Sequence, residues 1–203
     1  MEPLPETEIK KFLKENIEPL PNVFYGTGYS ASVCLVDRTF LPCVIFRNPK
    51  TIVDLAIKRF EKERTDEIMN PEQLGYFDIV KGFVARGNCI NAHEVGKVEI
   101  SRFAFPFSIL KQIRSETRMG WTAFVVKMKN GKCFNFGTTF SLEFFNLPEG
   151  YCVEDIDEII NHSYVLKTGE IESYYATAEK TTNEHKDVVY RERPYFVCYL
   201  DNL

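Results

Sequence analysis

Apolar residues between positions 121 and 138 give the strongest strand pattern in the chain. Two runs rich in Val, Phe and Cys, 121–128 and 132–138, flank Asn130-Gly131, the preferred centre of a two-residue type I′ hairpin turn. Large apolar side chains fall on both faces of this predicted hairpin. Such strands are typical of a sheet that is covered on both sides, so we expect the hairpin to be its central pair.

Apolar residues three and four positions apart predict several amphipathic helices. One is expected over 6–17, where four apolar residues share a face. The clearest helix is predicted over 49–64, because Asn48 is a good N-cap and Pro49 suits the first helical position. Further helices are expected over 71–86, 107–115 and 153–161.

The remaining apolar runs predict strands and set the fold class. These strands are expected over 31–37, 41–47, 96–105, 194–200 and, around Thr168-Gly169, over 163–167 and 170–176. Because helices and strands are mixed without regular alternation, the pattern favours an α+β fold. We expect a mixed, mostly antiparallel sheet with the hairpin at about 121–138 in its centre and several packed helices. The chain, 1–203, is expected to form a single domain with a mobile loop at 177–187.

The composition is that of an ordinary folded protein. The chain has 203 residues, of which 44% are hydrophobic and 27% are charged. A disordered chain would contain fewer apolar residues, and the 11 glycines show no triplet period, which excludes collagen. The length is typical of one domain and allows a buried core that needs neither a metal nor a disulfide.

The N-terminal residues and the cysteines point to the cytoplasm. The chain starts with acids and prolines, which is unlike a secretory signal, and no run approaches the roughly 20 apolar residues of a membrane span. The six cysteines include no CxxC pair, so we expect reduced thiols and no metal site. One alternative stays open: a hairpin around Arg38-Thr39 would bring Cys34 opposite Cys43, where a disulfide is sterically feasible.

Charge is distributed unevenly along the chain, whose formal net charge is −4. Residues 102–150 carry seven basic and three acidic residues, whereas residues 151–203 carry five basic and eleven acidic residues. Lys127, Lys129 and Lys132 gather at the predicted hairpin tip, where the turn places the last two opposite each other. Such a tip is either a solvated loop or a contact for an anion, and the acidic segment could equally dock on the basic one. Arg118 is a further basic candidate for binding.

Few residues offer nucleophilic or acid–base chemistry. Cys89 and His93 fall in one predicted loop and could form a nucleophilic pair. His162 follows Glu158 by four residues, so both would share a face near the end of the predicted helix. Two such ligands do not make a metal site, which needs at least a third. Each of these residues also has an ordinary structural interpretation, and we expect neither a metal nor a cofactor.

The C-terminal segment is rich in aromatic residues, with Tyr195, Phe196 and Tyr199 on the last predicted strand. A terminal strand this hydrophobic either inserts into the sheet or pairs with another chain. The sequence favours insertion. The alternative would make these residues an interface of a homo-oligomer.

These observations favour a soluble intracellular protein that acts by binding rather than by catalysis. We expect an accessory or inhibitor protein that recognises an anionic or protein partner through the basic hairpin tip. One alternative is a small enzyme or small-molecule-binding protein that uses Cys89, His93 and His162. Another is a nucleic-acid-binding module, which the overall acidity disfavours.

Overall fold

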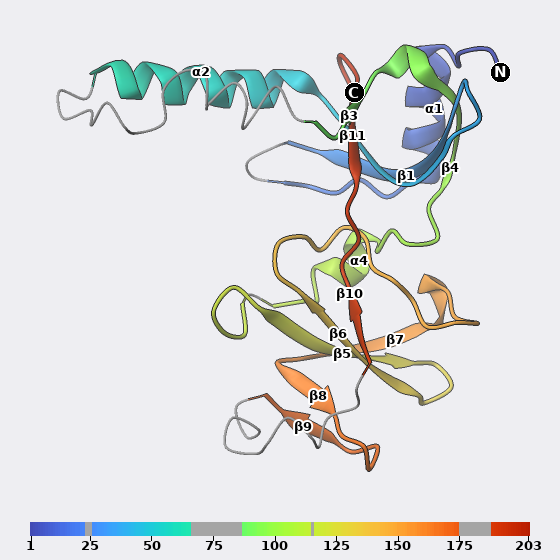
Figure 1. Ribbon diagram of the computed structural model, residues 1–203, viewed down its shortest axis with the longest axis vertical. Helices are drawn as coiled ribbons and strands as arrows, with labels where there is room; N and C mark the ends of the chain where they lie inside the picture. Colours follow the sequence, from blue (N-terminus) through green and yellow to red (C-terminus); the bar gives the residue numbers. More distant parts are fainter. Residues whose placement is uncertain (23–25, 66–86, 115, 175–187) are drawn as a thin grey trace. The chain divides into compact units, whose positions relative to one another are not determined.

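A computed structural model describes residues 1–22, 26–65, 87–114, 116–174 and 188–203 (Figure 1). The chain divides into two compact units. Unit 1 comprises Met1–Ile100 and Tyr195–Leu203, and unit 2 comprises Ser101–Pro194. The single domain expected over the whole chain stays a prediction.

The structure combines helices and strands in both units, in agreement with the α+β class. The described residues form three sheets rather than the one expected. They also contain only three α-helices, one of them four residues long, so the expectation of several packed helices was overstated. Most strand pairs are antiparallel, whereas the last two strands, β10 (Val189–Arg191) and β11 (Phe196–Tyr199), pair in parallel with their neighbours.

Unit 1 is built on a five-stranded sheet with the order β3-β11-β2-β1-β4. Its other elements are α1 (Glu6–Asn16), β1 (Gly28–Leu35), β2 (Phe40–Arg47), α2 (Pro49–Thr65), β3 (Cys89–Ile90), the 3-10 turn η1 (Ala92–Glu94) and β4 (Val95–Ile100). Helix α1 buries Ile9 and Leu13 in a core that includes Val33, Val44 and Phe46 of the sheet. This packing confirms the predicted N-terminal helix and the two strands that follow it.

Helix α2 begins where the sequence predicts. The Asn48 Oδ1 atom accepts a hydrogen bond from the Lys50 N–H at 2.9 Å, and Pro49 is the first helical residue. The strand predicted over 96–105 is shorter, since β4 ends at Ile100. The helix predicted over 71–86 and the loop predicted over 177–187 lie outside the described residues.

The C-terminal strand β11 is inserted into the sheet of unit 1. It pairs with β2 from Phe196 opposite Val44 to Tyr199 opposite Arg47, and its other edge pairs with β3 (Figure 1). Insertion, which the sequence favoured, is therefore confirmed. An oligomer formed by pairing this strand with another chain would require β11 to leave the sheet.

Unit 2 contains a four-stranded sheet with the order β10-β6-β5-β7 and a two-stranded sheet, β8-β9. Its elements before β10 are α4 (Phe107–Leu110), β5 (Thr122–Met128), β6 (Cys133–Thr138), the 3-10 turn η2 (Val153–Asp155), β7 (Ile156–Asn161), β8 (Ser163–Val165) and β9 (Ile171–Ser173). Strands β5 and β6 form the central pair, as predicted. Their buried Phe124 and Phe136 rings are stacked at 5.6 Å and lie against Phe145.

The register of the central hairpin differs by one residue from the predicted register. Lys127 lies opposite Cys133, which places Lys129 within the loop, so the predicted pairing of Lys129 with Lys132 is wrong. The Met128 N–H donates to the Lys132 carbonyl, and the Gly131 N–H donates to the Met128 carbonyl, both at 2.8 Å. These bonds close a three-residue loop, all of it described, in which only Gly131 has a positive φ, +82°. This is a turn with a glycine bulge rather than a type I′ turn.

The helix predicted over 153–161 is wrong, because these residues form η2 and strand β7. Ile156 and Ile159 are both buried although they are three positions apart, a spacing that in a regular strand points to opposite faces. A register shift explains this: Lys127 pairs with Glu158, whereas the next residue of β5 pairs with Ile156. The extra residue is a β-bulge, which gives a strand the apolar spacing of a helix.

All six cysteines are free thiols. Cys34 lies opposite Phe40 in the β1–β2 register, so the alternative of a disulfide with Cys43 is wrong. Among the described residues, no helix is both long enough and apolar enough to cross a membrane.

Candidate functional site

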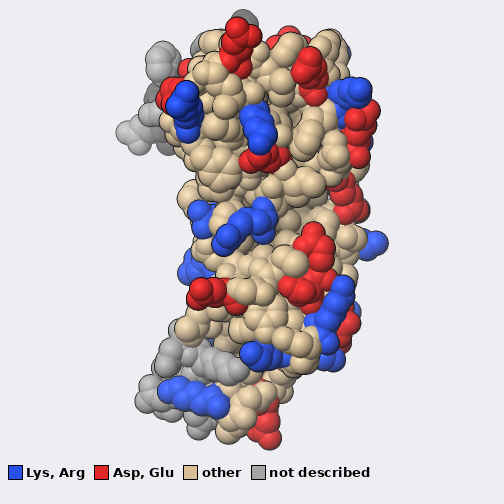
Figure 2. Space-filling view, turned by 90° about the vertical axis from the view of Figure 1, so that its right-hand side faces the viewer, with Lys and Arg blue, Asp and Glu red and all other residues tan. Residues whose placement is uncertain are grey.

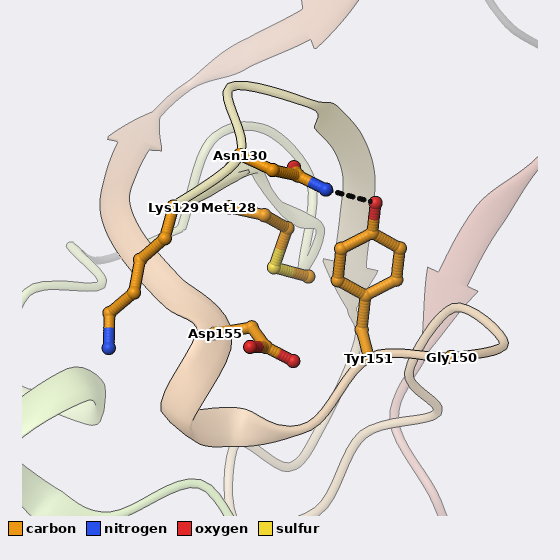
Figure 3. A pocket seen from close by; sticks show the side chains of 6 residues that line it. All are labelled: Met128, Lys129, Asn130, Gly150, Tyr151 and Asp155. Atoms are coloured by element: carbon orange, nitrogen blue, oxygen red, sulfur yellow. Dashed lines mark hydrogen bonds between the residues drawn. The ribbon is translucent and has the colours of Figure 1, made fainter.

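A polar pocket of about 330 Å³ lies at the turn that joins β5 and β6 (Figure 3). We call it the tip pocket. Its lining residues are Met128, Lys129, Asn130, Gly150, Tyr151 and Asp155. Three of them come from the end of β5 and the hairpin turn, and the others come from η2 and the segment that leads into it. The tip pocket therefore forms where the basic hairpin meets the acidic part of the sequence.

Hydrogen bonds hold the two sides of the tip pocket together. The Asn130 amide nitrogen donates to the Tyr151 hydroxyl at 2.8 Å (Figure 3). The Asn130 Oδ1 atom accepts from the Lys132 N–H at 3.1 Å, which fixes the asparagine within its own turn. The Tyr151 ring packs edge-on against Phe134 of β6, with the ring centroids 5.2 Å apart. The phenol is therefore positioned by packing as well as by its hydroxyl.

The lysine and the aspartate of the pocket are joined through the backbone. The Lys129 N–H donates to the Asp155 carbonyl at 2.8 Å. The Cys152 N–H donates to the Asp155 carboxylate at 2.8 Å, and together with the Cys152 thiol and the charge of Lys129 it lowers the pKa of Asp155. Asp155 is therefore ionised at neutral pH. Figure 3 shows its carboxylate and Tyr151 bordering the same space, with Lys129 extending along one side.

This arrangement offers a ligand one cation, one carboxylate, one phenol and one amide. Lys129 suits an anionic group, whereas Asp155 repels a simple anion and suits a donor or a cation. The pocket therefore matches a ligand that carries both kinds of group, such as a polar protein segment, better than it matches a bare phosphate.

Only one of the four predicted basic binding residues lines the tip pocket. Lys129 does so, but it lies in the turn and not opposite Lys132 as expected. Lys132 is exposed on the same loop. The Lys127 ammonium pairs with Glu158 at 3.4 Å and with Asp157 at 3.9 Å, so the acidic segment docks on the basic one within the chain. Arg118 lies at the opposite end of β5, where its backbone bridges to Trp121.

The predicted catalytic candidates are distributed over the two units. Cys89 lies on β3 and His93 in the exposed turn η1, both in unit 1. His162 belongs to unit 2, where its Nδ1 atom lies 2.8 Å from the Thr117 hydroxyl. Glu158 lies on β7 beside Lys127, so the expected helical face shared by Glu158 and His162 is wrong. Among the described residues, no group of three or more His, Cys, Asp or Glu could hold a metal ion.

Two of the other thiols are held in the protonated form. Hydrogen bonds to the carboxylates of Glu154 and Asp155 raise the pKa of Cys152. Burial raises the pKa of Cys198 to about 12. Because the thiolate is the nucleophile, these environments oppose reactivity at neutral pH.

The predicted aromatic interface lies on and beside β11 in unit 1. Phe196 is exposed, whereas Tyr195 and Tyr199 are half-buried. The interface built on these residues stays a prediction.

Charges of both signs are interspersed on the face of the described residues shown in Figure 2. Lys and Arg side chains there lie close to Asp and Glu side chains rather than gathering into one basic area. A protein that binds nucleic acid through its backbone usually presents such an area, so this face lends no support to that alternative.

Of the six residues that line the tip pocket, only Lys129 was among the predicted site residues. Asn130 was predicted only as a turn residue, and Asp155 only as a residue near the start of a helix. Tyr151, which follows a Pro-Glu-Gly sequence, was given no role. The sequence carried one usable signal, the turn sequence that Gly150 ends just before Tyr151. No protein-family model, curated protein or solved structure matches this chain.

Proposed function

We propose that this chain is a binding protein that recognises a polar segment of a protein partner through the tip pocket. The observation that carries the proposal is the juxtaposition of Lys129, Asp155 and Tyr151 around one space at a turn that hydrogen bonds hold in place. Binding by a preorganised loop avoids much of the entropy that a flexible loop would lose. An accessory or inhibitory role would use such a site.

The enzyme alternative has less support. The raised pKa values of Cys152 and Cys198 oppose thiolate chemistry at these two cysteines. A selective reaction of one cysteine with iodoacetamide near neutral pH would favour this alternative over ours. Protection of all six thiols until denaturation would remove it.

The proposal is tested by comparing two lysines on the same turn. Lys129→Ala removes a lining residue, and Lys132→Ala makes the same change of charge next to the pocket. Tagged wild-type protein and both variants are used to isolate partners from the host lysate, and the affinity of the purified partner is then measured by calorimetry. We expect Lys129→Ala to weaken binding at least about tenfold, as for a residue of an interface centre, and Lys132→Ala to change it less than about threefold.

A third variant separates the pocket from a general effect of charge. Tyr151→Phe keeps the ring and the net charge but loses the hydroxyl that accepts from Asn130. We expect it to weaken the same partner. Equal losses for Lys129→Ala and Lys132→Ala with no loss for Tyr151→Phe would contradict the pocket and leave only a diffuse electrostatic contact. Retention of a small metabolite with no protein partner would favour the small-molecule alternative.

A further inference from the structure

Large exposed apolar side chains lie in the segments that flank the central hairpin at the end away from its turn. Thr122 of β5 pairs with Thr138 of β6, so the segments 118–121 and 138–142 meet at one end of the sheet. We call these two segments the open end. Met119 is 88% exposed, and Phe140 is 73% exposed. The register therefore brings two of the most exposed apolar side chains in the described residues to one place.

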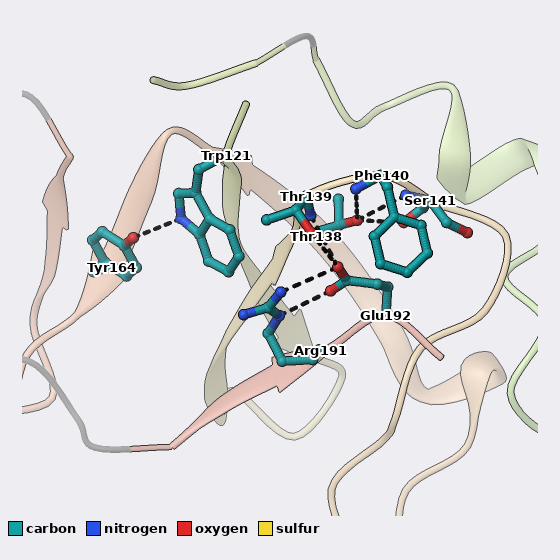
Figure 4. A network of polar contacts seen from close by, with 8 residues as sticks. All are labelled: Trp121, Thr138, Thr139, Phe140, Ser141, Tyr164, Arg191 and Glu192. Atoms are coloured by element: carbon teal, nitrogen blue, oxygen red, sulfur yellow. Dashed lines mark hydrogen bonds and ion pairs between the residues drawn. The ribbon is translucent and has the colours of Figure 1, made fainter. Parts of the chain in front are cut away.

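The loop that carries Phe140 is fixed by hydrogen bonds at four consecutive backbone N–H groups, and Figure 4 shows those of Thr139, Phe140 and Ser141. The Thr139 N–H donates to Glu192 at 3.0 Å, and the Leu142 N–H donates to Glu143 at 3.1 Å. The two N–H groups between them donate to the Thr138 hydroxyl oxygen at 3.2 and 3.1 Å. A loop in which each amide is satisfied holds Phe140 in one position in solvent.

The anchor of this loop is a buried carboxylate. The side chain of Glu192 is only 2% exposed, and it also accepts from the Thr139 hydroxyl at 2.9 Å. The Arg191 guanidinium pairs with it at 2.9 Å. Burying a charge is unfavourable unless it is paired and hydrogen-bonded, so this arrangement is fully compensated. The Phe140 loop depends on Glu192, because this carboxylate accepts from both the N–H and the hydroxyl of Thr139.

The neighbouring aromatic surface is equally fixed. Trp121 lies so close to Gly137 that a Cβ atom there would come within 2.0 Å of the ring. Its indole N–H donates to the Tyr164 hydroxyl at 2.9 Å, and the Arg191 guanidinium lies 4.6 Å from the ring centroid (Figure 4). The Arg191 side chain remains 49% exposed.

The turn before Trp121 keeps an apolar residue in an unfavourable conformation. Arg118 and Trp121 close a two-residue turn in which Met119 has φ +48° and Gly120 has φ +76°. A type I′ turn of this kind prefers Asn-Gly or Gly-Gly, and methionine at the first position is strained. Met119 is thus strained and at the same time almost fully exposed, a combination that is typical of a functional contact.

We infer that the open end is a second interaction surface, which docks Phe140 and Met119 into an apolar pocket of a protein partner whose rim carries carboxylates. Phe, Met, Trp and Arg are the residues that interface centres favour, and a rigid loop loses little entropy on binding. The exposed Arg118 and the half-exposed Arg191 provide the charge that acidic groups would complement. The carboxylates of the same loops accept hydrogen bonds within them, Glu116 from the Gly120 N–H and Glu143 from the Leu142 N–H. Two arginines, one of them already paired with Glu192, are too few for a phosphate-binding surface.

The test is photo-crosslinking from position 140, with position 40 as the matched control. Phe40 is an exposed phenylalanine of unit 1, 55% accessible, so a benzophenone amino acid replaces the same residue type in both places. In the host cell we expect one cross-linked protein partner from position 140. The same partner should not be cross-linked from position 40. The cross-linked peptide should combine apolar residues with Asp or Glu. The purified partner should then bind wild-type protein and lose at least about tenfold in affinity with Phe140→Ser.

A second variant separates binding from stability. Met119→Asn creates the Asn-Gly sequence that this turn prefers, so we expect a higher Tm together with weaker binding of the same partner. Phe40→Ser, the same substitution at the exposed control position of unit 1, should leave this affinity unchanged. The inference is overturned if position 140 gives no adduct beyond the control, if the adduct is nucleic acid or a second copy of this chain, or if Phe140→Ser and Met119→Asn both bind with wild-type affinity.

Discussion

The two ends of the β5–β6 hairpin hold their loops in different ways. At the tip, the loop depends on Gly131, on the bond from Asn130 to Tyr151 and on ion pairs of Lys127 that are accessible to water. At the open end, the loop depends on the buried carboxylate of Glu192 and on an indole seated against a glycine. One sheet thus carries one loop fixed by solvated contacts and one fixed by buried contacts.

This difference teaches which end tolerates change. Solvated contacts are weak and replaceable, because water can satisfy the groups that lose a partner. Buried contacts depend on one another. Removing one member leaves a buried polar group without a hydrogen-bond partner or an aromatic ring without its packing surface. We therefore expect the effects of substitution to fall steeply from the open end to the tip.

The largest effect is expected for Gly137→Ala, which would break the open end. The added Cβ atom would meet the Trp121 ring at 2.0 Å, a distance that forces the indole away from β6. Overpacking of this severity should lower the free energy of unfolding by about 3 kcal/mol or more. Because Trp121 is the only tryptophan in the chain, its fluorescence during urea unfolding reports the change in unit 2.

The matched control is Gly87→Ala. A Cβ atom at Gly87 meets nothing within 4 Å, so we expect a change within about 0.5 kcal/mol. A wild-type fluorescence spectrum and urea midpoint for Gly137→Ala would show that the indole does not depend on this glycine.

The next effect concerns pH and the anchor of the Phe140 loop. Burial would raise the pKa of Glu192, but hydrogen bonds from Arg191 and Thr139 outweigh it and lower the pKa from 4.5 to about 2. A lowered folded-state pKa contributes stability above the unfolded value that is lost as the pH falls. We therefore expect unit 2 to lose up to roughly 3 kcal/mol between about pH 5 and pH 2.

This pH dependence should depend on one residue. Unfolding of Glu192→Gln, followed by Trp121 fluorescence from pH 7 to pH 2, should show lower stability at pH 7 and a flatter profile than the wild type. Glu149→Gln, an exposed carboxylate of the same unit, serves as the control and should keep the wild-type profile. Parallel profiles for wild type and Glu192→Gln would contradict the assignment.

The smallest effect is expected at the tip, where Lys127 pairs with Glu158 at 3.4 Å. Both side chains are more than a third exposed, so the coupling should be about 0.5 kcal/mol or less. A double-mutant cycle with Lys127→Ala and Glu158→Ala measures this coupling energy. The coupling energy should fall further at about 1 M salt, because the Debye length is then only about 3 Å. A salt-independent coupling above about 1 kcal/mol would show that the tip is held as rigidly as the open end.

The sequence predicted the central hairpin but not its register, and the reason lies in one glycine. Both a type I′ turn and a three-residue turn with a glycine bulge use the Asn130-Gly131 pair. They differ by one residue of register, which local sequence does not determine. The Lys129 N–H donates to the carbonyl of Asp155, which is distant in sequence, and no local sequence pattern predicts this hydrogen bond.

Strand β7 shows a second limit of periodicity. Ile156 and Ile159 have the spacing of a helical face, but a bulge against β5 gives a strand the same spacing. The pairing partner decides between the two, and a single sequence does not show it. The tip pocket follows the same logic: Lys129 was predicted from the gathering of lysines, whereas Tyr151 and Asp155 reach it only because β7 pairs with β5.

The insertion of β11 between β2 and β3 has a consequence for how the chain is made. The five-stranded sheet of unit 1 contains residues 196–199, whereas unit 2 is one continuous segment, Ser101–Pro194. During synthesis, β1 and β2 leave the ribosome long before the strand that must lie beside them. Unit 2 is therefore free to fold first, and the sheet of unit 1 lacks the strand between β2 and β3 until residues 196–199 have been translated.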